Sequence, residues 1–147
     1  MAETNPPGQR SSPVRDGRLP VLLLGLAFLP TALQATVAPR SFFDDFPLGR
    51  GWVSMDGAVY DEHLVRDVGG LFLAMVILSF MAWFRPSLCF PLGIAWLVQG
   101  VLHLVFHIRH LHGFETVDTV GLVGSLLAVP VLATWAIIAG RMHPGTG

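Results

Sequence analysis

The chain has 147 residues, of which 52% are hydrophobic and only 13% are charged. This composition is too apolar for an ordinary soluble domain. The formal net charge of -1 argues against nucleic acid as a partner and against a polybasic lipid-binding tail. The single cysteine, Cys89, excludes an internal disulfide and any motif of paired cysteines.

Ionisable residues leave four long gaps along the chain. No Asp, Glu, Lys or Arg occurs in residues 19–39, 68–84, 86–108 or 119–140. A helix that crosses a bilayer needs about 20 residues, and each gap is close to that length. The sequence therefore predicts an all-α fold, a bundle of four transmembrane helices in contact with the lipid bilayer of the cell membrane.

The bundle is expected to form one membrane domain, residues 18–141, between two polar tails. Residues 1–17 are rich in Pro, Ser and Gly and show no apolar periodicity, so they predict a disordered N-terminal tail. Residues 142–147 form a short C-terminal tail. The first apolar run, Leu19 to Ala38, is longer than the apolar region of a signal peptide, and we interpret it as an uncleaved anchor.

A row of polar side chains follows the third apolar run, Ala95 to His112. If this run is helical, Gln99, His103, His107 and His110 fall within an arc of about 80° on one face. Polar groups are costly in hydrocarbon, so the row should face a protein interior or a wet cavity.

The longest connection, Arg40 to His63, contains Phe42, Phe43, Phe46 and Trp52. Aromatic side chains are favoured at the interface between membrane and water. Two interpretations are open for this connection. It is a solvated loop that lies along the interface, which we favour, or it is part of a lid over the histidine end of the bundle.

Alternating helix directions bring further polar residues to the membrane face that holds the histidines. The second helix opens with two pairs at i,i+4 spacing, which can meet side by side, and Asp118 opens the fourth helix. We expect His103, His107 and Asp67 to lie close together in one pocket. The complete predicted polar cluster is Gln34, Glu62, His63, Arg66, Asp67, Gln99, His103, His107, His110 and Asp118.

Three interpretations of this cluster stay open. In the first, His–Asp and Arg–Asp pairs hold the helix ends together. In the second, the cluster binds a metal ion or haem, with His103, His107, His110 and Asp67 as candidate ligands. In the third, it handles protons, a quinone or another small lipid, since intramembrane His and Asp often serve proton relays.

The sequence contains no HExxH, P-loop or GxGxxG motif, and it identifies no catalytic residues. Its features fit a small accessory or redox-associated membrane subunit, acting with a membrane-protein partner or as a homo-oligomer. The alternative is a metal- or haem-binding membrane enzyme that uses the histidine row.

Small residues predict where helices approach each other closely. Gly70 and Ala74 have the small-xxx-small spacing that suits close contact between membrane helices. Gly121, Ser125 and Ala128 offer a second face of this kind.

The segment Tyr60 to Gly70, YDEHLVRDVGG, resembles a family of small bacterial four-helix membrane proteins of unknown function. The likeness continues through His103 to His112 and through Thr116-Val117-Asp118, and these proteins are in turn similar to the wider DoxX-like group. The resemblance covers roughly Leu19 to Gly140 and implies the same four-helix bundle. It brings no established activity and therefore assigns no catalytic residues.

The distribution of arginine predicts the orientation in the membrane. Five arginines lie at the termini and in the Arg85 turn, and four lie in the other two connections. Because cytoplasmic segments carry the excess of basic residues, both termini should be cytoplasmic. Reporter fusions after Gly147 and within residues 40–63 measure this directly, and the first should report the cytoplasm. An external signal from the fusion after Gly147 would reverse the orientation.

Overall fold

The computed structural model describes residues 12–54 and 57–142. Within these residues, four helices are long and apolar enough to cross a membrane. They confirm the predicted all-α, four-helix bundle of a multi-pass membrane protein, and a short helix and a 3-10 turn are added to them. The elements in chain order are α1 (Arg18–Val37), α2 (Pro39–Asp45), α3 (Glu62–Phe84), η1 (Pro86–Leu88), α4 (Cys89–Arg109) and α5 (Thr116–Met142).

Local sequence explains where α3 begins and ends. The side chain of Asp61 accepts a hydrogen bond from the backbone N–H of Leu64 at 3.1 Å, which satisfies one of the unpaired donors at the helix start. At the other end, Arg85 precedes Pro86, and a residue before proline is disfavoured in the helical region. The chain therefore leaves α3 at this point and turns through η1 into α4.

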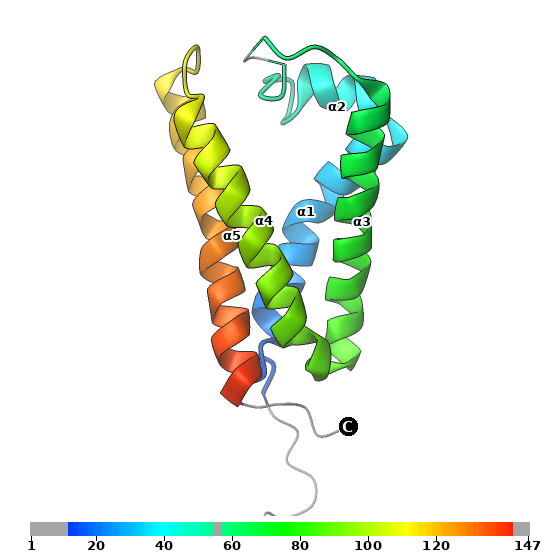
Figure 1. Cartoon of the computed structure of the whole chain (residues 1–147), viewed down its shortest axis with the longest axis vertical. Helices are drawn as coiled ribbons and strands as arrows, with labels where there is room; N and C mark the ends of the chain where they lie inside the picture. Colours follow the sequence, from blue (N-terminus) through cyan, green and yellow to red (C-terminus); the bar gives the residue numbers. More distant parts are fainter. Residues whose placement is uncertain (1–11, 55–56, 143–147) are drawn as a thin grey trace, which may run out of the picture.

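The four long helices form two pairs, α1 with α3 and α4 with α5 (Figure 1). Glycines bring the helices of each pair close together. A Cβ atom on Gly69 of α3 would lie 2.8 Å from the backbone nitrogen of Thr36 in α1. A Cβ atom on Gly100 of α4 would lie 2.6 Å from Cγ1 of Val129 in α5. Small residues at helix contacts are how helices in membranes pack closely, because lipid gives no hydrophobic drive for association.

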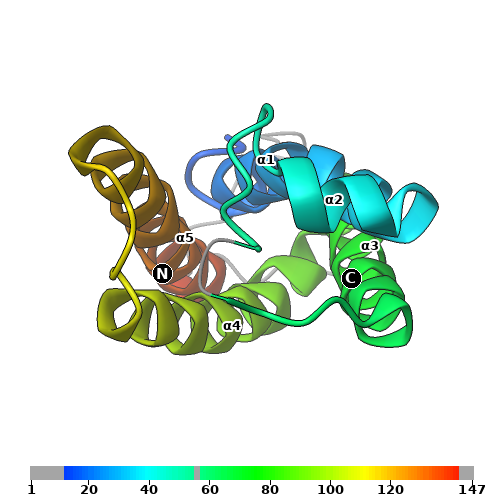
Figure 2. The same cartoon turned by 90° about the horizontal axis from the view of Figure 1, so that it is seen from above.

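The two pairs meet at one end of the bundle and diverge toward the other (Figure 1). We call the first end the base, where α1 begins and α5 ends. We call the other the histidine end, where α2 lies and where α4 connects to α5, as the view from above shows (Figure 2). Apolar side chains join the pairs in a buried core around Trp96, which also contains Val21, Leu24, Ala82, Cys89, Leu92, Val129, Ala133 and Ala136.

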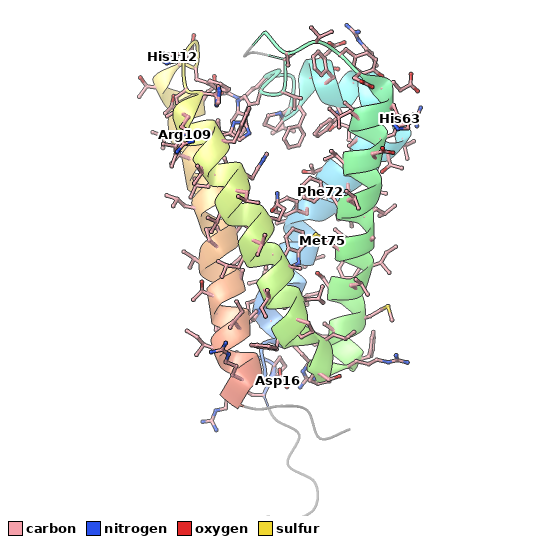
Figure 3. All side chains as sticks on the ribbon, viewed as in Figure 1. Asp16, His63, Phe72, Met75, Arg109 and His112 are labelled. Carbon is pink, nitrogen blue, oxygen red and sulfur yellow. The ribbon has the colours of Figure 1, made fainter. Side chains whose placement is uncertain are left out.

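The residues just before α1 are packed into the base (Figure 3). Asp16 is 1% exposed and accepts a hydrogen bond from Nε of Arg18 at 2.8 Å. Gly17 has a φ of 82°, and a Cβ atom there would lie 2.9 Å from the carbonyl oxygen of Ala136. In the described part of the tail predicted for residues 1–17, Asp16 and Gly17 therefore pack against the bundle. The rest of the two predicted tails, residues 1–11 and 143–147, lies outside the described residues.

The predicted small-residue contact faces are wrong in detail. A Cβ atom on Gly70 would meet nothing within 4 Å in the described part of the chain, so the glycine in contact is its neighbour Gly69. Ser125 and Ala128 are exposed and line a cavity instead of packing on a helix. A spacing of four residues defines a helix face, and only the packing selects which face is used.

We predict that Gly69→Ala lowers the free energy of unfolding by about 1–3 kcal/mol, because the new methyl group overlaps the backbone of α1. Gly70→Ala is the matched control, since its methyl group enters open space. Thermal unfolding of both variants in detergent measures the difference. Equal midpoints would contradict the close α1–α3 contact.

Candidate functional site

A cavity of about 870 Å³ lies between the two helix pairs. Residues of all four long helices, of α2 and of the loop between α2 and α3 contribute to its lining. Most of these residues are aliphatic or aromatic. The volume lies within the range of roughly 300–1,000 Å³ that is typical of small-molecule sites.

Aromatic rings form the part of the cavity wall that adjoins the buried core. Phe28 of α1 and Phe72 of α3 both line it, and their ring centroids are 5.1 Å apart. The centroid of Phe28 is 4.6 Å from that of buried Trp96 in α4. The indole N–H of Trp96 donates to Oγ of Ser79 at 3.1 Å, so its polar atom is satisfied. Figure 3 shows Phe72 and Met75 pointing from α3 toward the space between the pairs.

One wall of the cavity carries the polar row of α4. Gln99, His103, His107 and His110 all line the cavity. Their periodicity in the sequence predicted that they share one helix face and that this face meets a protein interior or a cavity. With a rise of 1.5 Å per residue, the helical part of the row, Gln99 to His107, extends over about 12 Å of the bundle axis. The other walls are dominated by apolar groups, so the cavity has one polar side.

The imidazole rings of this row contact neighbouring rings. The ring centroids of His103 and His107 are 4.6 Å apart, and the rings are nearly perpendicular at 86°. Phe106 stacks on His110 with a centroid distance of 4.3 Å.

His110 lies just after the end of α4 at Arg109, where the sequence predicted a continuing helix. Its Nδ1 atom lies 2.7 Å from the carbonyl oxygen of Phe106. A carbonyl oxygen can only accept, so Nδ1 carries the proton. In the neutral ring, this leaves Nε2 as the acceptor.

Gln99 carries a polar atom without a partner in the described part of the chain. Its Oε1 atom is buried and has no hydrogen-bond partner among the described residues. A buried polar atom without a partner costs about 1–3 kcal/mol, and each such atom in a folded protein calls for a physical explanation. Other atoms of the Gln99 side chain line the cavity, so a rotation of the amide is needed before a bound molecule can reach Oε1.

The connection between α2 and α3 lies at the histidine end of the bundle (Figure 2). Phe42 of α2 lines it together with Phe46, Pro47, Trp52 and Val53 of the following loop. This geometry fits a lid better than the solvated interface loop that we favoured from the sequence. The reason is that the aromatic side chains turn toward the space between the helix pairs.

We call Phe42 and the loop residues 46–53 the lid. An ion pair joins the lid to α5. Asp118, at the start of α5, is 5% exposed. Its Oδ1 atom accepts hydrogen bonds from Nη1 of Arg50 at 2.5 Å and from Nε1 of Trp52 at 2.9 Å. We call these three residues the latch. No motif in the sequence pointed to Arg50 or Trp52 as partners of Asp118, because 66 or more residues separate them.

The two predicted i,i+4 pairs form at the start of α3. Nε of Arg66 lies 2.8 Å from Oε1 of Glu62, and Nε2 of His63 lies 3.2 Å from Oδ2 of Asp67. The side chain of Asp67 is 61% exposed, and Asp67 is not among the residues that line the cavity. The structure therefore does not bring Asp67 into one pocket with His103.

The described part of the chain contains no group of three or more His, Cys, Asp or Glu side chains that could hold a metal ion. Of the four predicted ligands, His103, His107 and His110 share the cavity wall, whereas Asp67 belongs to the exposed pair on α3. Gln34 also lies away from the cavity lining, and its amide donates to a serine of α2 at 3.3 Å.

Comparisons with models of protein families, with curated proteins and with solved structures find no match to this chain. The resemblance of the YDEHLVRDVGG segment to a bacterial four-helix family stays a prediction. In the structure, this segment opens α3. Asp61 caps the helix, and Nη1 of Arg66 donates to the carbonyl oxygen of Thr36 at 2.6 Å, which ties α3 to the end of α1.

We predict that Asp118→Ala frees the loop around Trp52 and lowers the thermal stability of the protein in detergent, since it removes two hydrogen bonds to this carboxylate. Asp67→Ala is the control, because its carboxylate is largely exposed. Hydrogen exchange of the amides in residues 46–54 should be faster in the first variant alone. Unchanged exchange in Asp118→Ala would show that the latch does not hold the lid.

Proposed function

We propose that the protein binds a lipid-soluble molecule in the cavity between its two helix pairs. The apolar part of the molecule packs against Phe28, Phe72 and the aliphatic walls, and its polar group faces the row on α4. The observation that carries this proposal is the composition of the lining. A large apolar space with a few convergent polar groups is the usual form of a ligand site.

The arrangement of α3 and α4 supports entry of the ligand from the membrane. The two helices diverge as they leave the η1 turn (Figure 1), and close packing is found within the pairs instead of between them. A molecule dissolved in lipid can therefore approach the polar wall sideways. Phe42, Phe46 and Trp52 cover the cavity at the histidine end, on the side that faces water.

This function suits a small accessory or redox-associated subunit that holds its ligand for a membrane-protein partner or a second copy of the chain. With the orientation inferred from the arginines, the histidine end lies on the extracytoplasmic side. Ligand binding would then take place in the outer half of the membrane.

A metal ion or a haem group is the second candidate. The observation that favours it is the pair His103 and His107, whose rings lie 4.6 Å apart on one helix face, since imidazole is a common metal ligand. An absorption spectrum and metal analysis of the purified protein test this candidate. A bound chromophore or ion that is lost in His103→Leu would establish it.

We predict that Ala128→Phe reduces the amount of lipid-soluble ligand that co-purifies with the protein, because the larger side chain takes up part of the cavity that Ala128 lines. Thr134→Phe is the control, since Thr134 lies on the same helix, is also small and exposed, and is not part of the lining. Organic extraction and mass spectrometry, expressed per mole of protein, measure the ligand. Equal amounts in the two variants would contradict binding in this cavity.

A further inference from the structure

We infer that the polar group of the ligand is an uncharged planar ring that bears oxygen, of the phenol or quinone class, and not the anionic head of a fatty acid or phospholipid. This inference rests on the proposed function, because it names the chemical class of the molecule that the cavity holds. Charge, hydrogen bonding and ring contacts support it separately.

The lining offers no fixed counter-ion. Among the described residues that line the cavity there is no Arg, Lys, Asp or Glu. Arg50 and Asp118, which fasten the neighbouring loop, pair with each other. Adjacent imidazoles with centroids 4.6 Å apart would repel each other if both carried a charge. A charge buried without a partner is strongly unfavourable, so the cavity selects a neutral head.

The polar side chains of this wall can form hydrogen bonds with a hydroxyl or carbonyl oxygen of the ligand. An amide has both a donor and an acceptor end, and a neutral imidazole has one of each. Gln99 brings an amide to the lining. Gln99 and His103 are separated by one helical turn, about 6 Å along the axis. Two oxygens on opposite edges of one ring span a similar distance, so a single ring can meet both side chains.

The rings that line the cavity favour a planar head over an acyl chain. Aromatic pairs in offset or tilted contact add stabilisation beyond the area they bury, and Phe106 already makes such a contact with His110 at 4.3 Å. Aromatic residues reach the cavity from α1, α2, α3, α4 and both connections at the histidine end. They are Phe28, Phe42, Phe46, Trp52, Phe72, Phe106 and Phe114.

Three probes separate the possible head groups: a decyl-substituted benzoquinone, oleate as a single-chain anion, and farnesol as a neutral alcohol without a ring. Each is added to the full-length protein in detergent. Because Trp52 lines the cavity, quenching of tryptophan fluorescence reports the quinone, and the other two probes are tested as competitors. We expect saturable quenching by the quinone, with weak competition by oleate and farnesol.

Gln99→Leu tests the role of the amide. We expect it to weaken quinone binding about fivefold, the effect of losing one hydrogen bond, while the ligand-free variant keeps at least the thermal stability of the parent because a buried unpaired atom is removed. Gln34→Leu is the matched control, since Gln34 lies outside the lining, and it should bind the quinone as the parent does.

Stronger binding of oleate than of the quinone would overturn the inference, and so would equal displacement by farnesol or unchanged quinone binding by Gln99→Leu. In each of these results a lipid-soluble molecule still occupies the cavity, so the proposed function stands. If no probe binds and no lipid-soluble molecule co-purifies, the proposed function itself fails and the inference fails with it.

Discussion

Close packing at glycines holds α1 against α3 and α4 against α5, and the cavity exists because the contact between these pairs is looser than the contact within them. Gly69 and Gly100 lie where a side chain would overlap the partner helix. In lipid, which solvates apolar side chains well, such packing is a main source of helix association. The pairs join around Trp96, and beyond this residue they diverge toward the histidine end.

The polar row of α4 faces the cavity because polar groups are costly in hydrocarbon. The same cost explains why these residues share one helix face in the sequence. Hydrocarbon provides no hydrogen-bond partners, so an amide and three imidazoles are placed where protein, water or ligand can supply them. The lid completes this enclosure at the histidine end. Its latch joins Arg50 and Trp52 to Asp118, so the loop that lines the cavity is held to the start of α5.

Local spacing correctly predicted two side-chain pairs at the start of α3, outside the cavity. The pairs Glu62–Arg66 and His63–Asp67 form as their i,i+4 spacing indicated. The same reasoning did not find the partners of Asp118. Arg50 is 68 positions away, and its place in space depends on how α2 and the following loop fold back over the bundle. The prediction that Asp67 lies in one pocket with His103 was wrong. Two residues at equal depth on two helices need not face each other, because depth does not determine which way a side chain points.

By itself, the sequence determined the four membrane helices, their order and the polar face of α4. These features depend on the spacing of charged and apolar residues along one chain, and the membrane makes that spacing decisive. Tertiary structure alone decided which glycines touch, which helices pair and what surrounds the histidines. Gly69 and Gly70 are indistinguishable as letters, yet one meets the backbone of α1 and the other faces open space, because helix rotation is set by packing across the whole interface.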